Sequence, residues 1–143
     1  MAATYRLSFG RRFVNVIVGA LVRLGLAGRR TYILTVEGRK SGRRYSTPVQ
    51  LIFLDGQCWL VSPYGEQSWV KNARAAGTVA LTRARRTERA RVAEVDPPTA
   101  APVLREYLRK TPVTRAYFEA RSDSPLEAFA AEAARHPVFR IEQ

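Results

Sequence analysis

An apolar stretch without alternation lies near the start of the chain. Residues 13–26 are almost wholly apolar, with a pair of arginines on each side and Arg23 inside the stretch. The stretch is shorter than the roughly 20 apolar residues that a transmembrane helix needs. We therefore predict a basic amphipathic helix over residues 1–29, which either packs on the domain or lies at a membrane surface.

β-Branched and aromatic residues dominate the next part of the chain and indicate strands separated by turns. The predicted strands are Thr31–Glu37, Tyr45–Leu54, Gln57–Ser62, Thr78–Thr82 and Arg89–Val95. Pro48 requires an edge or a bulge in the second strand, because proline has no N–H to donate to a ladder. Asp55–Gly56 is a strong hairpin signal, and a further turn is expected over residues 83–88.

Helical patterns interrupt the strands once and dominate the last third of the chain. Ser68 is expected to cap a helix that runs to about Ala76, and Gly77 provides its C-terminal stop. The later helices are predicted from apolar positions at helical spacing, followed by one short strand. These elements are Thr99–Lys110, Val113–Ala120, Leu126–Arg135 and the strand Val138–Ile141.

Together the elements predict an α+β fold in which about six antiparallel strands form a small barrel. A length of 143 residues and an apolar fraction of 46% fit one folded domain. We predict a single domain over residues 1–143. It consists of an N-terminal basic helix (1–29), a barrel core (30–95) and a helical region with a last short strand (96–143).

Cysteine and histidine are almost absent, which narrows the possible chemistry. The chain has 1 cysteine and 1 histidine, so an internal disulfide framework and the usual Cys/His zinc sites are excluded. No metal site is expected. A serine or cysteine hydrolase would have to use His136 as its base, and this residue lies in an Arg-His-Pro stretch near the C-terminus. Hydrolysis is therefore disfavoured.

The net charge of +12 lies entirely within residues 1–95. Such a field attracts anions, which include nucleic acid, anionic lipid and small molecules that carry phosphate or carboxylate groups. The aromatic residues lie mostly within the predicted strands and helices. This placement favours a packed core over a surface on which bases could stack. We therefore expect a small-molecule partner and no nucleic acid.

The first predicted turn contains several basic and hydroxyl groups, three of them between two glycines and two directly after the second glycine. Glycine allows a tight turn and close approach of a ligand, while backbone N–H groups with Arg and Lys make an anion site. A solvated hairpin tip would show the same residues. The group comprises Arg39, Lys40, Ser41, Arg43 and Arg44, with Gly38 and Gly42.

The second candidate site is the segment Pro63–Asn72, where a strand end, a glycine turn and a helix start follow one another. Helix N-termini and such turns present several N–H donors at one place. A flavin-like ring could rest there and accept backbone hydrogen bonds at its polar edge. Alternatively, Trp69 within this segment is an ordinary core residue.

Taken in order, these segments resemble the deazaflavin-dependent nitroreductases, an actinobacterial split-barrel family that uses coenzyme F420. The resemblance covers residues 30–95 well and the last helices loosely. The residues that carry it are Gly38-Arg39-Lys40-Ser41-Gly42, Ser46-Thr47-Pro48, Asp55-Gly56, Gly65 with Trp69-x-x-Asn72, and the terminal His136-Pro137-Val138-Phe139-Arg140-Ile141.

The resemblance implies a split β-barrel that holds the deazaflavin in a groove. It assigns the phosphate and polyglutamate tail to Arg39, Lys40, Ser41 and Gly42, with Arg43 or Arg44 in place of the Arg that many members carry at Tyr45. It assigns the groove wall to Thr47 and Pro48. It places Ser62, Pro63, Tyr64, Gly65, Ser68 and Trp69 at the ring, and Lys71 and Asn72 at the helix or the tail.

The chemistry that follows from the resemblance is hydride transfer from the reduced deazaflavin to an acceptor. The acceptor class comprises quinones, enones, nitro compounds and unsaturated acyl chains. Because the cofactor carries the difficult step, no protein nucleophile is needed. Tyr64, Tyr107 and Tyr117 are candidate proton donors or pocket residues, and ordinary core packing is the alternative for each.

Three alternative functions remain open from the sequence. The same barrel could bind flavin mononucleotide or haem, although flavin mononucleotide has a shorter anionic tail and His136 is the only histidine for haem. The third alternative is a basic module without enzymatic activity that binds a membrane or nucleic acid. We expect a cytoplasmic protein, with peripheral membrane contact through residues 1–30 as a variant, and the sequence shows no preferred oligomeric state.

Overall fold

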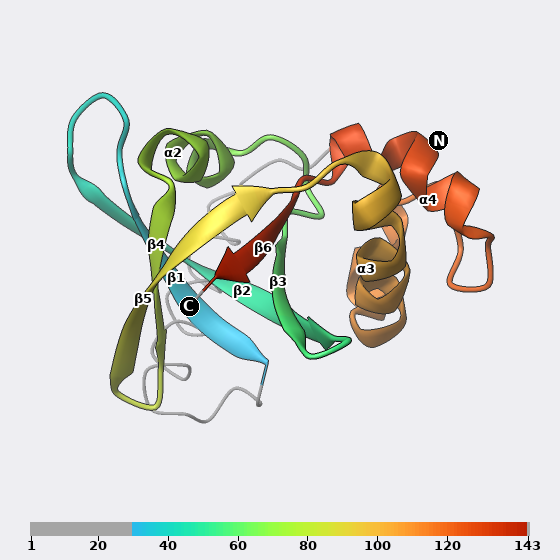
Figure 1. Ribbon diagram of the computed structural model, residues 1–143, viewed down its shortest axis with the longest axis horizontal. Helices are drawn as coiled ribbons and strands as arrows, with labels where there is room; N and C mark the ends of the chain where they lie inside the picture. The colour runs from blue at the N-terminus through green and yellow to red at the C-terminus, as the bar shows by residue number, and fades with distance from the viewer. Residues whose placement is uncertain (1–29, 143) are drawn as a thin grey trace.

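The computed structural model describes residues 30–142, so the predicted helix over residues 1–29 lies outside the described part of the chain. Within residues 30–142 the strands form one closed antiparallel barrel in the order β1-β2-β3-β6-β5-β4 (Figure 1). Their bounds are β1 Thr31–Glu37, β2 Arg44–Leu54, β3 Gln57–Val61, β4 Thr78–Arg83, β5 Arg86–Glu94 and β6 Val138–Glu142. The predicted α+β class and the split-barrel fold are thereby confirmed.

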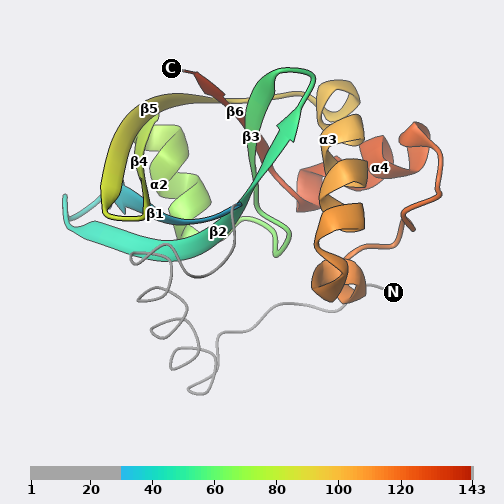
Figure 2. The ribbon, with the colours of Figure 1, turned by 90° about the horizontal axis from the view of Figure 1, so that it is seen from below.

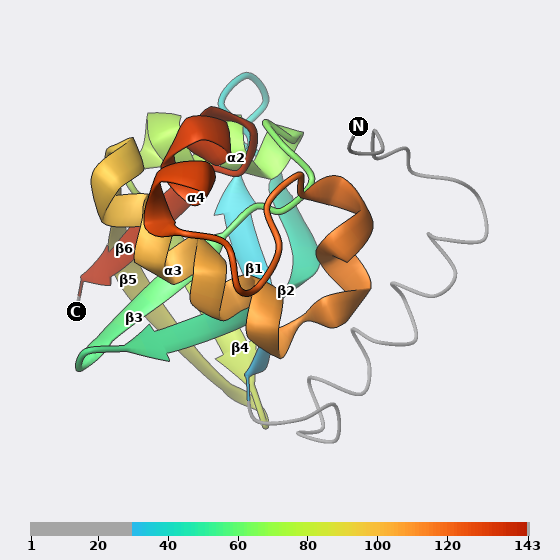
Figure 3. The same ribbon diagram turned by 90° about the vertical axis from the view of Figure 1, so that its right-hand side faces the viewer.

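The helices occupy two places around this barrel. The helix α2 (Ser68–Ala76) lies across one end of it, as the view along the barrel shows (Figure 2). The helices α3 (Pro97–Lys110) and α4 (Leu126–Glu132) form a layer against one side (Figure 3). Within residues 30–142 there are also two 3₁₀ helices, η1 over Pro112–Tyr117 and η2 over Ala133–Arg135.

The barrel interior is one of two apolar cores. Because side chains alternate between the faces of a strand, each strand sends every second residue inward, for example Leu34, Leu60 and Phe139, which are at most 1% exposed. Val70 and Ala73 of α2 complete this core from the end of the barrel. Burial of these side chains supplies the main driving force for barrel closure.

The second core lies between the outer face of the barrel and the layer of α3 and α4. Ile52 and Val138 point outward from their strands, yet both are at most 1% exposed, because Leu104 of α3 and Phe129 of α4 cover them. The segment from Pro97 to Arg135 is therefore packed against the sheet and fixed relative to the barrel.

Most predicted elements are found close to their expected bounds. The helix α2 matches the prediction, and Gly77 ends it with a φ of 72°. The prediction for Pro48 is also confirmed, since residues 44–50 of β2 pair with β1 alone and residues 51–54 pair with β3. Pro48 thus lies where one edge of the strand has no ladder partner among the residues that the structure describes.

Several local predictions were wrong. Ser68 does not cap α2, because Gln67 holds the N-cap position and makes no side-chain bond there. The predicted turn over residues 83–88 is tighter, since Ala84 and Arg85 adopt φ values of 52° and 64° and β5 begins at Arg86. The two later helical pieces are confirmed as helical, with a finer assignment. The piece predicted over Val113–Ala120 is the 3₁₀ helix η1, which ends at Tyr117, and the piece predicted over Leu126–Arg135 consists of α4 followed by η2.

The apolar content of the described helices is limited. No helix within residues 30–142 is both long and apolar enough to cross a membrane.

Candidate functional site

The loop between β1 and β2 presents the predicted anion-binding residues on a defined turn. Gly38 N–H donates to the Arg43 carbonyl at 2.6 Å, and Gly42 N–H donates to the Gly38 carbonyl at 2.9 Å. Gly42 has a φ of 72°, a left-handed conformation that favours glycine. Lys40 and Arg43 are exposed on this loop, and Arg44 is exposed at the first position of β2. Their charges therefore face solvent and are accessible to an anion.

Asn72 connects this loop to α2. Its Oδ1 accepts hydrogen bonds from the Arg39 backbone N–H at 3.0 Å and from Arg39 Nη1 at 2.8 Å. The Asn72 side chain is buried, with 3% of the residue exposed. Figure 1 shows the β1–β2 loop and α2 side by side at the same end of the barrel. Asn72 therefore acts on the candidate anion site by orienting Arg39.

Ser41 is engaged within the loop itself. Its Oγ accepts a hydrogen bond from Arg43 N–H at 3.2 Å and lies 3.5 Å from the hydroxyl of Tyr45. The Tyr45 ring lies over Gly38, where an added Cβ would come within 2.7 Å of a ring carbon. Tyr45 is thus part of the loop packing, and the cationic groups of the site are supplied by its neighbours in sequence.

The predicted groove residues Thr47 and Pro48 are half-buried on β2. Both belong to the part of β2 that pairs only with β1 among the described residues. An unpaired strand edge presents backbone groups that can bind a ligand. This edge follows directly after the basic loop, so the predicted tail residues of the loop and the predicted groove residues of β2 are adjacent along the chain.

The loop between β3 and α2 is held by its own hydrogen bonds. Ser62 Oγ donates to the Gly65 carbonyl at 2.6 Å, and Ser62 N–H donates to the Pro137 carbonyl at 2.8 Å. Ser62 and Pro63 are buried, whereas Tyr64 and Gly65 are half-buried. The Ser62 hydroxyl is therefore used to close the turn, and Tyr64 is the side chain of this loop best placed to meet a ligand.

The residues predicted on α2 differ in their surroundings. Trp69 is half-buried and packs against Phe139 of the barrel core, with ring centroids 6.1 Å apart. Ser68 and Lys71 are exposed. Trp69 therefore packs in part as an ordinary core residue, which was the alternative for it in the sequence. Ser68 and Lys71 remain accessible on α2.

The three predicted tyrosines come together from three different elements. Tyr64 and Tyr117 meet edge to face, with ring centroids 4.8 Å apart and an interplanar angle of 77°. Tyr107 on α3 is buried, and burial raises its pKa, with a further increase from the nearby Tyr64. Tyr107 is thus the most buried of the three tyrosines, whereas Tyr64 and Tyr117 are half-buried and accessible to a ligand.

Arg30 adds a cationic group near these tyrosines. Its Nη2 donates to the Lys110 carbonyl at 3.5 Å, and its charge acts on the Tyr107 phenol. Its Nη1 is buried and has no hydrogen-bond partner within residues 30–142. The sequence prediction did not include Arg30 in the site, because it counted this residue only as part of the basic flank of the N-terminal segment.

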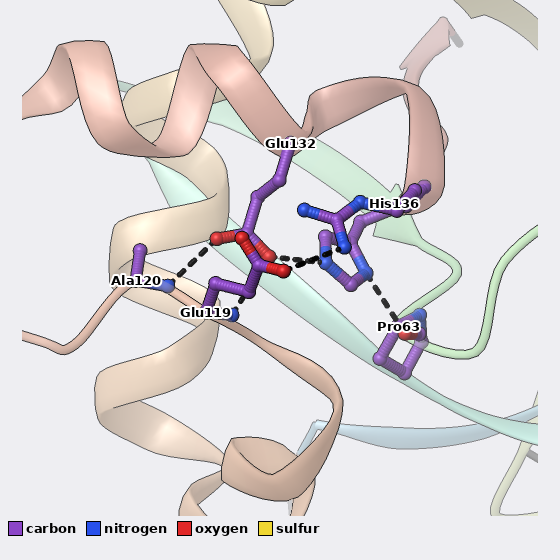
Figure 4. A network of polar contacts seen from close by, with 6 residues as sticks. Pro63, Glu119, Ala120, Glu132 and His136 are labelled. Atoms are coloured by element: carbon purple, nitrogen blue, oxygen red, sulfur yellow. Dashed lines mark hydrogen bonds and ion pairs between the residues drawn. The ribbon is translucent and has the colours of Figure 1, made fainter. Parts of the chain in front are cut away.

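A buried Glu132–His136 pair is the main feature that the sequence prediction missed (Figure 4). His136 Nε2 lies 2.8 Å from Glu132 Oε1, and His136 Nδ1 lies 2.9 Å from the Pro63 carbonyl. With both ring nitrogens engaged, His136 is not available as an axial ligand for haem. The spacing of the pair, one helical turn apart, is the only sequence signal that could have indicated it.

A groove of about 180 Å³ lies elsewhere, on the outer side of β1, β4 and β5. Thr35, Arg44 and Arg89 are among its lining residues, and Arg44 alone belongs to the predicted site. Cofactor pockets usually enclose at least about 300 Å³, so this groove is too small for a deazaflavin with its tail.

Comparison with known proteins gives a family and a set of related folds. A family model described as F420H(2)-dependent quinone reductase matches residues 10–131. No curated protein matches the chain. A solved structure described as an F420-H2-dependent reductase (FDR-A) has 20% identity and a TM-score of 0.57, over 80% of this chain and 95% of that chain.

Two further solved structures are similar. One is described as a domain-swapped dimer and has 18% identity and a TM-score of 0.59, over 94% of this chain and 97% of that chain. The other is an FAD-binding protein from Mesorhizobium loti with 17% identity and a TM-score of 0.51, over 89% of both chains. At these identities the structural likenesses show the fold alone.

Proposed function

The chain belongs to the F420H(2)-dependent quinone reductase family and is therefore an F420H2-dependent reductase, and we propose that a quinone is its acceptor. The description of the family favours quinones over the enones, nitro compounds and unsaturated acyl chains that hydride chemistry would also allow. The site residues proposed below are those that the sequence resemblance assigns, together with the contacts that the structure adds to them.

The donor set of the β1–β2 loop suits the anionic tail of F420. Lys40, Arg43 and Arg44 are exposed there, and Asn72 orients Arg39 through two hydrogen bonds. Arginine offers a fork of donors to phosphate or carboxylate, and lysine adds a point charge. We assign the phosphate and glutamate carboxylates of the tail to this loop, with Ser41, Gly42 and Lys71 at its margins.

The ring would be held by the unpaired edge of β2 and by the loop between β3 and α2. Thr47 and Pro48 provide the first wall. The second wall consists of Ser62, Pro63, Tyr64 and Gly65, with Ser68 and Trp69 from the start of α2. The residues of the second wall are fixed by the turn bonds of Ser62 and by the packing of Trp69 on Phe139, which favours a preformed site.

When bound, reduced F420 supplies a hydride from its ring. The chain binds and orients the reactants, and it holds the proton that the reduced acceptor requires. We propose that Tyr117 or Tyr64 holds this proton at its phenolic oxygen, because the two half-buried rings are in contact at 4.8 Å. This tyrosine pair is the observation that supports the acceptor side of the proposal. Tyr107 is more deeply buried than either of them.

The proposal is tested by the oxidation of F420H2 with matched acceptors. We expect a naphthoquinone to give a kcat/KM at least about tenfold above those of a nitroimidazole and a cyclic enone, a difference of about 1.4 kcal/mol in barrier. Tyr117→Phe should lower kcat by about 100-fold, as loss of a general acid does, without changing F420 affinity. Tyr32→Phe, which alters a tyrosine that packs against the barrel core, is the control.

Equal rates with the three acceptors, or faster turnover of the nitroimidazole, would contradict a quinone acceptor. An unchanged kcat in Tyr117→Phe would contradict the proton role of Tyr117 and leave Tyr64→Phe to show whether its partner carries that role.

A further inference from the structure

His136 contacts the chain on both sides of the tyrosine pair. Its Nδ1 lies 2.9 Å from the carbonyl of Pro63, the residue before Tyr64. Its ring stacks on Phe118, the residue after Tyr117, with centroids 3.9 Å apart and an interplanar angle of 16°. The residue is 2% exposed, so packing leaves its ring little freedom to turn.

The hydrogen bonds define where the protons of this imidazole lie. A backbone carbonyl can only accept, so Nδ1 carries a hydrogen and donates it to Pro63. A second hydrogen lies between Nε2 and Glu132 Oε1, which are 2.8 Å apart. Glu132, 2% exposed, thereby fixes the rotation of the ring that the Pro63 bond requires.

Glu132 also holds the chain beyond Tyr117. Its Oε1 accepts from Glu119 N–H at 3.1 Å and its Oε2 accepts from Ala120 N–H at 2.7 Å. Figure 4 shows these bonds and the Pro63 bond converging on the Glu132–His136 pair from separate segments of the chain. The pair therefore connects the β3–α2 loop with the segment that follows η1.

We propose that His136 is a positioning residue, oriented by Glu132, that sets the placement of Tyr64 relative to Tyr117 for the reaction. The inference rests on the proposed function of this tyrosine pair. The hydrogen bond between His136 and Pro63 then has a role in turnover. This role is separate from the contribution that the buried Glu132–His136 pair makes to folding. The effect passes through Pro63 and Phe118, the chain neighbours of Tyr64 and Tyr117 that His136 contacts.

Two amide substitutions separate the two halves of the network. In His136→Asn the side-chain amide lies near the position of Nδ1 and can still donate to the Pro63 carbonyl. In His136→Gln the amide reaches toward the position of Nε2, so it can keep the Glu132 contact while it loses the Pro63 bond. Each variant removes one buried hydrogen bond, and we expect comparable losses in thermal unfolding temperature.

The first readout is steady-state turnover with F420H2 and a naphthoquinone. We expect kcat to fall at least about tenfold in His136→Gln, since small misplacements of reacting groups have effects up to about 100-fold. It should fall no more than about threefold in His136→Asn. Equal kcat values in the two variants would overturn the inference.

The second readout does not depend on turnover. The ring resonances of Tyr64 and Tyr117 would be assigned in protein with labelled tyrosine and without cofactor. The Tyr64 resonance should shift in His136→Gln and stay near its original position in His136→Asn. The Tyr117 resonance should shift in both variants, because both remove the ring stacked on Phe118. If the natural protein fails to reduce the quinone but these shifts are seen, the proposed acceptor falls and the positioning role stands. Unshifted resonances in His136→Gln would overturn the role.

A third variant covers the case in which the His136 variants do not fold. Phe118→Leu removes the ring stacked on His136 and leaves every hydrogen bond of the pair in place. We expect its Tyr117 resonance to shift and its kcat to fall while F420 affinity is retained. If neither quantity changes, the placement of Tyr117 does not depend on this contact, and the inference fails.

Discussion

At the scale of single residues, the site depends on side chains that orient other side chains. Asn72 was predicted to hold the helix or the tail, and the structure shows that it accepts two hydrogen bonds from Arg39. A motif could place Asn72 near the site, but its partner is 33 residues away. The same reason explains why the sequence did not indicate the contact between His136 and Pro63, which are 73 residues apart.

The tail assignment leads to a test at this scale. The double variant Arg39→Ala/Lys40→Ala should weaken F420 binding by at least about tenfold, because hydrogen bonds to charged groups contribute about 1.5–3 kcal/mol each and solvent screens part of this. The dissociation constant is measured by titration that follows the fluorescence of F420.

The matched control is Arg85→Ala/Arg86→Ala. It removes the same charge from the β4–β5 turn, and Figure 1 shows this turn at the end of the barrel opposite to the β1–β2 loop. Its F420 affinity should stay close to that of the natural protein. Equal weakening in both double variants would show that overall charge, rather than the β1–β2 loop, binds the tail.

At the scale of elements, local sequence signals were most successful where a single residue type determines a boundary. Gly77 marked the end of α2, and the apolar residues from Val138 marked β6. The β4–β5 turn was misjudged because Ala84 and Arg85 adopt left-handed conformations that usually indicate glycine or asparagine. The 3₁₀ helices were predicted only as helical pieces, because apolar spacing does not distinguish a 3₁₀ helix from an α-helix.

The start of α3 gives a prediction at the scale of elements. Asp96 Oδ1 accepts from Thr99 N–H at 3.0 Å and caps the helix. Hydrogen bonds from Thr99 lower the pKa of Asp96 below its ordinary value of 3.8. A lowered pKa in the folded state means that the contribution to stability is present above the unfolded pKa and is lost as the pH falls through the folded one.

Asp96→Ala should therefore lower the thermal unfolding temperature at neutral pH, and its difference from the natural protein should narrow below pH 3.8. Asp96→Asn is the control, because asparagine also caps helices and carries no charge to titrate. Its unfolding temperature should lie above that of Asp96→Ala at neutral pH. A difference between the natural protein and Asp96→Ala that is the same at every pH would rule out a role for the carboxylate charge.

At the scale of the whole molecule, two cores fix the site between them. The barrel core holds α2 and thereby the Asn72–Arg39 contact, while the outer core holds the layer of α3 and α4 that carries Tyr107 and Glu132. The antiparallel barrel and its basic loop were predictable from turn signals and from the family motifs. The convergence of Tyr64, Tyr107 and Tyr117 was not, because packing between distant segments determines it.

The central claim is that this barrel is adapted to the anionic tail of F420, and a binding titration tests it most directly. F420, flavin mononucleotide and a deazaflavin riboside without phosphate or glutamate would be titrated against the same protein. We predict saturable binding of F420, with the other two ligands weaker by at least about tenfold because they lack most of the charges that the β1–β2 loop binds. Flavin mononucleotide or the riboside binding as tightly as F420 would contradict the claim.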